Sequence, residues 1–305
     1  MELINLENFL AYFEKHKLFW PSVKRNREKN KVLFDELGSV MVNWAKNYLG
    51  EDQYKETMFK GYKSFVTDVG KSQMEYEKRG TYQNKSYAEV YASVYNNSDH
   101  MQLYHWGVYT TTFAWEHHLK IYKFFKEYFL PLLSKEKGRL LELGSGSGIW
   151  GLLFLNEFSD WNVVGVDISE RSVEIANKMK TVTGFSDQTL YKLDDALSFK
   201  DEQKFDAAIS CFLLEHIENP ERLFQNISNN IDVGGYAFVT GALTAAEVDH
   251  ITEFKSESEI VKMAELAGFR VIATFSVSPS PYPTNYKFLP RSMALVIQKR
   301  RNEIW

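Results

Sequence analysis

The sequence has little that would point to a secreted, membrane-spanning or nucleic-acid-binding protein. Its single cysteine, Cys211, excludes an intrachain disulfide and suits a reducing compartment. Residues 1–10 include two glutamates and lack the basic start of a signal peptide. There is no run of about 20 apolar residues, and the net charge of −4 gives no general attraction to nucleic acid. We therefore expect a cytoplasmic protein that does not span a membrane, and its overall charge does not favour nucleic acid as a partner.

The first part of the chain is predicted to be helical and rich in aromatic residues. Apolar residues recur at helical spacing within residues 1–90. The basic run at 15–31 is more simply a solvated face than a phosphate contact. Residues 91–138 are dense in aromatic side chains, and we expect them to form connecting helices and a lid. This division leaves residues 139–305 as a separate domain.

Strands and helices alternate in the pattern of residues 139–305, which is typical of an α/β fold with a parallel sheet. No helical pattern separates the last two strands, so we expect them to form an antiparallel hairpin at one edge of the sheet. The predicted strands cover 139–143, 162–166, 189–193, 205–210, 235–240, 270–276 and 292–298.

The segment 139–151, RLLELGSGSGIWG, predicts a strand, a glycine-rich turn and the start of a helix. Such a unit binds a nucleotide-like ligand at the carboxyl end of a parallel strand. Read from Gly146, it matches the GxGxxG of dinucleotide-binding proteins. Read from Glu142, it is an acidic residue followed by alternating glycines. Asp167 is at a suitable distance along the chain to bind a ribose in either interpretation.

The second interpretation resembles motif I of the class I S-adenosylmethionine (SAM)-dependent methyltransferases, and later segments support it. The resemblance extends over residues 139–300 and is closest to small-molecule enzymes. It implies a seven-stranded, mostly parallel Rossmann-like sheet with an antiparallel last strand, and SAM as the cofactor. A dinucleotide-binding enzyme would not have the later segments, which are VVGVD ending at Asp167, Leu193–Ala196, Phe205–Ile209, Leu214–Pro220, Val233–Gly235 and Ala267–Phe269.

The resemblance also implies which residues hold the cofactor. Asp167 would accept hydrogen bonds from the ribose hydroxyls, and Asp195 would accept one from the adenine amino group. Asp194 stands where relatives have a small residue, and Cys211 is expected to pack near the cofactor. The complete predicted set is Glu142, Gly144, Ser145, Gly146, Gly148, Asp167, Ile168, Asp194, Asp195, Ala196, Cys211 and Tyr109.

Catalytic and substrate-binding candidates come from the loops expected near the methyl group. His216 lies in the Leu-Glu-His segment after the fourth strand, and either a general base or a loop-orienting residue fits this place. His105 lies in an aromatic segment that resembles one in amine N-methyltransferases, where aromatic groups face cofactor and substrate. The predicted substrate-binding residues are Tyr104, Trp106, Tyr282 and Tyr286.

Four of the seven histidines fall within residues 91–138, which also contain Glu116. Their spacing does not match a motif such as HExxH, so we predict no metal site. These histidines are His100, His105, His117 and His118.

The predicted function is methyl transfer from SAM to an N or O atom of a small metabolite. Two alternatives stay open. The chain could methylate RNA or protein with residues 1–90 as the recognition module, or it could be a non-catalytic SAM-binding assembly protein. A homodimer is compatible with any of the three.

Overall fold

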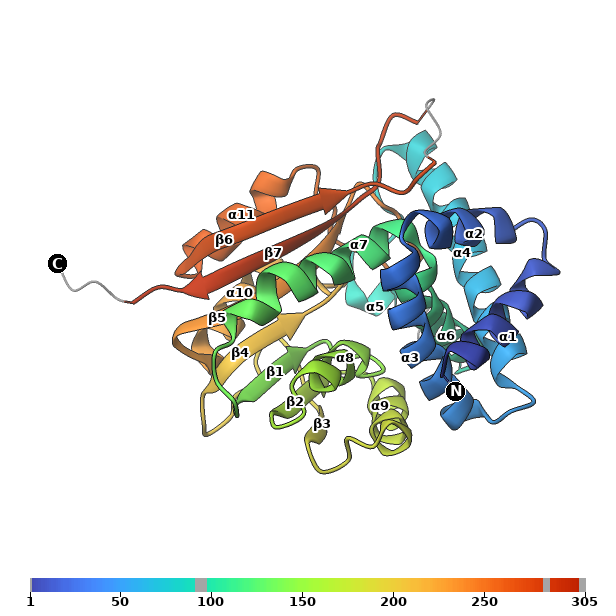
Figure 1. Ribbon diagram of the computed structural model, residues 1–305. Coiled ribbons are helices and arrows are strands. Elements are labelled where there is room, and N and C mark those ends of the chain that lie inside the picture. The colour runs from blue at the N-terminus through green and yellow to red at the C-terminus, as the bar shows by residue number, and fades with distance from the viewer. Residues whose placement is uncertain (1, 91–97, 282–285, 302–305) are drawn as a thin grey trace. The chain divides into compact units, whose positions relative to one another are not determined.

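The computed structural model describes residues 2–90, 98–281 and 286–301 (Figure 1). The chain forms two compact units. The helical unit comprises residues 1–123, 246–249 and 277–289, and the sheet unit comprises 124–245, 250–276 and 290–305. Within the described residues, no helix combines the length and the apolar character needed to cross a membrane.

Helices occupy most of the described residues 2–90 in the helical unit. Aromatic side chains form much of its core, with Phe113 packed edge-on against both Phe9 and Phe34. Its elements are α1 (Glu2–Glu14), α2 (Trp20–Lys29), α3 (Lys31–Leu49), α4 (Tyr54–Arg79), α5 (Tyr87–Val90), α6 (Ser98–Ala114) and α7 (Glu116–Phe124), which reaches the unit boundary.

Two glycines allow α4 and α6 to approach closely. A Cβ on Gly61 would lie 2.6 Å from the Cβ of Trp106, and one on Gly107 would lie 2.5 Å from the Cβ of Phe65. Both distances are too short for real Cβ atoms, so this contact between the helices requires glycine at both positions.

The basic run at 15–31 is tied into the helical unit by ion pairs. Arg27 pairs with Glu7 and, at 2.6 Å, with Asp35. Lys29 pairs with Glu116 at 3.2 Å. These contacts give several basic residues of the run a partner inside the chain.

The sheet unit contains a seven-stranded sheet in the order β3-β2-β1-β4-β5-β7-β6. β1 to β5 pair in parallel, and β7 runs antiparallel to β5, which confirms the predicted fold class. The strands are β1 (Arg139–Leu143), β2 (Asn162–Asp167), β3 (Thr189–Leu193), β4 (Phe205–Ser210), β5 (Ile231–Leu243), β6 (Phe269–Val277) and β7 (Arg291–Lys299).

Side chains that alternate along the central strands build a core on each face of the sheet. Ala237 and Val239 of β5 belong to a buried cluster with side chains of α10 and α11. Phe238, between them, packs against Phe125 and Trp150, which come from η2 and α8. The remaining elements are η2 (Phe125–Phe129), η3 (Leu130–Leu132), α8 (Ile149–Glu157), α9 (Glu170–Thr183), η4 (Leu214–His216), α10 (Pro220–Asn230) and α11 (Glu257–Leu266).

β5 is longer than the predicted strand 235–240, and it extends beyond that range at both ends. Ile231 already pairs with Phe205, and the register then shifts before Ala207 pairs with Tyr236. At the other end, pairing with β7 continues to Leu243. The sequence pattern ends the strand too early because it does not show how far the pairing with β4 and β7 extends.

The close contact of α4 and α6 can be tested by Gly107→Ala. We expect this variant to lower the free energy of unfolding by about 1–3 kcal/mol, because the new methyl group meets Phe65 and the carbonyl of Gly61. Urea denaturation provides the measurement. The matched control is Gly70→Ala in α4, where an added Cβ meets nothing within 4 Å, and which we expect to stabilise by about 0.5–1 kcal/mol. Equal effects of the two substitutions would contradict the proposed packing.

Candidate functional site

The loop between β1 and α8 folds back over the end of β2. Gly144, Gly146 and Gly148 have φ angles of 70°, 52° and 75°, in the left-handed region that favours glycine. The N–H groups of Gly144 and Ser145 both donate to the carbonyl of Val166, at 2.9 and 3.0 Å. The glycine-rich turn predicted from the sequence is therefore held by main-chain hydrogen bonds to the neighbouring strand.

The carboxylate of Asp167 connects this loop to the loop after β2. Its Oδ2 accepts from the N–H of Gly146 at 2.8 Å, and its Oδ1 accepts from the N–H of Ser169 at 2.9 Å. Burial raises the pKa of Asp167, whereas these two hydrogen bonds act to lower it. The main-chain carbonyl of Asp167 accepts from the N–H of Asp194 at 3.1 Å. Three loops at the carboxyl ends of β1, β2 and β3 thus meet at one residue.

Glu142 lies buried in β1 beneath the glycine loop. Its Oε1 accepts from the N–H of Gly151 at 3.2 Å, and a Cβ on Gly151 would lie 2.5 Å from its Oε2. Burial raises the pKa of Glu142 to about 8. Among the described residues, neither Glu142 Oε2 nor the buried Ser145 Oγ has a hydrogen-bond partner. Polar atoms buried in this way usually have a partner, so this loop has the chemistry to receive a polar ligand such as SAM.

Two apolar side chains stand exposed at the strand ends beside Asp167. Ile168 is 54% exposed and Leu193 is 56% exposed, and Leu193 pairs with Asp167 in the sheet register. An exposed apolar pair suits the faces of an adenine ring. Sequence reasoning named Ile168 and missed Leu193, although its place as the last residue of β3 could have indicated it.

The loop after β3 holds the remaining predicted adenine-side residues. Asp195 accepts from the N–H of Leu197 at 2.8 Å and from the hydroxyl of Ser198 at 3.2 Å, so it organises its own turn. Asp194 is exposed, and Ala196 is buried and accepts from Asn226 at 2.8 Å. A carboxylate has about four acceptor positions, so Asp195 can accept a further hydrogen bond.

The loop after β4 brings Cys211 and His216 to the same edge of the sheet. Burial raises the pKa of Cys211 well above its usual range, and the carboxylates of Glu142 and Glu215 add to this effect. Phe212 has a φ of 54°, which is unusual for a side chain of this size, and its N–H donates to Thr240 at 2.8 Å. His216 follows at the end of η4.

Other predicted site residues lie in the helical unit. The hydroxyl of the buried Tyr109 donates to the carbonyl of Met41 at 2.7 Å, and Trp106 packs edge-on against Tyr109. Tyr104, His105 and Tyr286 are half-buried. Tyr282 lies outside the described residues. Contacts of this group with a ligand stay predictions.

Two of the four histidines within residues 91–138 pack against each other in the helical unit. The rings of His117 and His118 are 4.5 Å apart and both contact Trp115. Burial lowers the pKa of His117 well below its ordinary value and that of His118 to about 3, so both are neutral. Glu116 pairs with Lys29 and Lys120. The side chain of His100 lies outside the described residues.

Comparison with known protein families identifies the family to which this glycine loop and sheet belong. The family model described as a methyltransferase domain matches residues 115–274, more than half of the chain. The chain belongs to this methyltransferase family. The match includes the glycine loop, Asp167 and the loops after β3, β4 and β5.

Curated relatives of this methyltransferase match part of its length. It is 30% identical over 152 residues to malonyl-[acyl-carrier protein] O-methyltransferase 1 of Ilyobacter polytropus, over 46% of this chain and 56% of the relative. It is 28% identical over 173 residues to the biotin biosynthesis bifunctional protein BioHC of Teredinibacter turnerae, over 50% of this chain and 30% of the relative.

A solved structure shares the fold over a longer stretch. This is phosphoethanolamine N-methyltransferase 2 of Haemonchus contortus in complex with S-adenosyl-L-methionine. It has a TM-score of 0.54 and 16% identity, and the match covers 72% of this chain and 61% of that one.

The buried carboxyl of Glu142 predicts a pH dependence that Glu142→Gln should remove. With a pKa of about 8 against an ordinary 4.5, the folded chain keeps a proton that the unfolded chain releases. The stabilising contribution is complete below pH 4.5 and is lost as the pH rises to about 8. In this window the wild type should lose up to about 1.4 kcal/mol of unfolding free energy per pH unit relative to the variant.

Urea denaturation of both proteins at about pH 5 and about pH 8 measures this difference. Glutamine resembles the protonated acid in shape and keeps an oxygen acceptor for Gly151, so the two proteins should be close in stability at the lower pH. Parallel stability curves would show that Glu142 does not retain its proton.

Proposed function

We propose that the chain transfers a methyl group from SAM to an N or O atom of a small metabolite. The observation that carries this proposal is the glycine loop fastened to Asp167, with polar and apolar groups placed beside it. The names of the relatives support acceptors of both kinds, since one is an O-methyltransferase and another an N-methyltransferase.

The residues at the strand ends suit the separate parts of SAM. The carboxylate of Asp167 would accept from the ribose hydroxyls, and Asp195 would accept from the adenine amino group. The exposed side chains of Ile168 and Leu193 would contact the adenine faces. Glu142 and the glycine loop would lie toward the methionine part, where Glu142 Oε2 and Ser145 Oγ are without partners among the described residues.

SAM supplies an electrophilic methyl group on a positively charged sulfur, and the chain has mainly to position an acceptor in line with it. Alignment of the reacting atoms removes much of the entropy cost of the reaction. Exclusion of water helps because the positive charge on the sulfur is spread over the reacting atoms in the transition state. An amine or a phenol also has to lose a proton, and His216 and His105 stay the predicted groups for this step.

The ion pairs of the basic run favour a small acceptor over RNA. Arg27 and Lys29 are paired with carboxylates inside the helical unit, so they offer less charge to a phosphate backbone. An RNA-binding face would instead present unpaired cations and bind with a strong dependence on salt.

Cofactor binding can be tested by calorimetric titration with SAM and S-adenosylhomocysteine. Asp167→Ala should lower the affinity for both ligands by about 10- to 100-fold, because hydrogen bonds to a charged group contribute about 1.5–3 kcal/mol. The matched control is Asp160→Ala, an exposed carboxylate just before β2, which should leave both affinities unchanged. NAD should not bind.

Asp167 also supports its own loops, so each variant is first compared with the wild type by thermal unfolding. Asp167→Asn keeps an oxygen acceptor and should have an intermediate affinity. Equal affinities for the wild type and a folded Asp167→Ala would refute the assignment, as would a preference for NAD. A subsequent screen with radiolabelled SAM would start with amines and carboxylates.

A further inference from the structure

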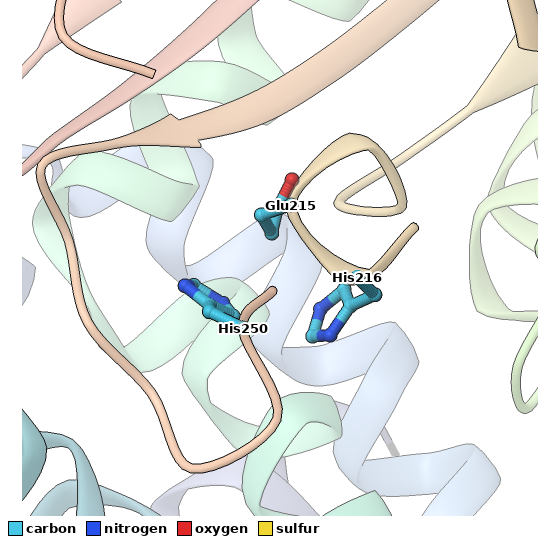
Figure 2. A group of neighbouring side chains, drawn as sticks. All are labelled: Glu215, His216 and His250. Atoms are coloured by element: carbon cyan, nitrogen blue, oxygen red, sulfur yellow. The ribbon is translucent and has the colours of Figure 1, made fainter. Parts of the chain in front are cut away.

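Three potential metal ligands come together within the sheet unit, at the ends of β4 and β5. The ligand atoms of Glu215, His216 and His250 all lie within 4.8 Å of one another. Figure 2 shows that Glu215 and His216 come from the short helical turn after β4, while His250 comes from the loop after β5. Two imidazoles and one carboxylate are a donor set that divalent transition metals use.

His250 is oriented as a metal ligand usually is. Its Nδ1 lies 2.7 Å from the main-chain carbonyl of Ala245. Only a protonated Nδ1 can donate to that oxygen, so in the neutral ring the lone pair is on Nε2. Metal-binding histidines commonly donate their other ring N–H to a carbonyl in this way, which holds the ring in place.

Hydrogen bonds join the two loops that carry the three residues. The carbonyl of Glu215 accepts from the N–H groups of Ile251 and Thr252, at 2.8 and 3.0 Å. The hydroxyl of Thr252 donates to the carbonyl of Ile217 at 2.6 Å. These hydrogen bonds fix the backbone of the two loops, and therefore the starting points of the three side chains, relative to each other.

Each loop also has a residue in the left-handed region near its start. Phe212 has a φ of 54° and Thr244 a φ of 48°. Such conformations cost about 1–3 kcal/mol each in residues other than glycine, and they occur most often at functional sites. Here they turn the chain near the ends of β4 and β5, in the loops that lead to the three potential ligands.

We propose that Glu215, His216 and His250 bind one divalent transition-metal ion of the Zn²⁺ type. Around such an ion the ligand distances are about 2.0–2.2 Å, so neighbouring donor atoms lie about 3.3 Å apart. The donors therefore close by about 1.5 Å at most when the ion binds. His216, which is less buried than the other two residues, is the side chain best placed to move.

Three protein ligands leave a coordination position for water or for an oxygen of another molecule. The site is close to the glycine loop, because a Cβ on Gly144 would lie 2.8 Å from the side chain of Leu213, which directly precedes the turn that carries Glu215 and His216. A hydroxyl or carboxylate of the methyl acceptor could take the open position, a role that rests on the proposed function. His216 would then act as a ligand to the metal and not as a base.

Metal binding can be measured without SAM or any acceptor, so its outcome does not depend on the proposed methyl transfer. Protein stripped with a chelator is titrated with Zn²⁺ in a calorimeter and with Co²⁺ in an absorption experiment. We expect one ion per chain, with a Zn²⁺ dissociation constant of about 1 µM or below. The visible bands of bound Co²⁺ should show four or five ligands of nitrogen and oxygen.

Substitution of the ligands separates this site from general surface binding. Glu215→Gln and His250→Gln should each lower the affinity for Zn²⁺ by at least about 100-fold and abolish the visible bands of bound Co²⁺. The matched controls are Glu218→Gln, an exposed glutamate in the same loop, and His16→Gln in the helical unit; both should bind like the wild type. All variants are first shown to have the wild-type circular dichroism spectrum.

Two outcomes would overturn the proposal. One is the absence of saturable Zn²⁺ binding to the wild type. The other is unchanged binding in folded Glu215→Gln and His250→Gln. The wild-type titration decides the question even if a ligand variant fails to fold.

Discussion

The sheet unit depends on one carboxylate that fastens two loops. Asp167 accepts from Gly146 on one side and from Ser169 on the other, while its main chain receives the N–H of Asp194. Loops at the ends of three neighbouring strands thereby take fixed positions. This preorganisation means that little ordering remains to be done when a ligand binds, which favours affinity.

Much of the sheet and its glycine loop could be predicted because their signals are local. The alternation of strands and helices and the glycines at 144, 146 and 148 can be read in short windows of sequence. The additional length of β5 could not, since Ile231 and Leu243 are in the strand only through their partners Phe205 and Arg291. Such pairing is a property of the folded chain.

The candidate site likewise contains residues that the sequence could predict and residues that it could not. Asp167 and Asp195 follow recognisable motifs and come to the same edge of the sheet. His250 follows no motif, and only the fold brings it to Glu215 and His216. His117 and His118, which belong to the aromatic part of the sequence, are neutral and pack against Trp115. A run of aromatic residues predicts a buried core as readily as a binding site.

The discontinuous helical unit has a consequence for synthesis of the chain. In α4, Gln73 accepts from the N–H of Ala246 at 2.9 Å, and Glu77 accepts from the N–H of Phe288 at 2.9 Å. The ring of Phe288 also packs on Tyr76, with centroids 4.5 Å apart. A ribosome makes α4 long before it makes these partners. The helices that emerge first therefore cannot complete their core until the segments that carry Ala246 and Phe288 have also been made.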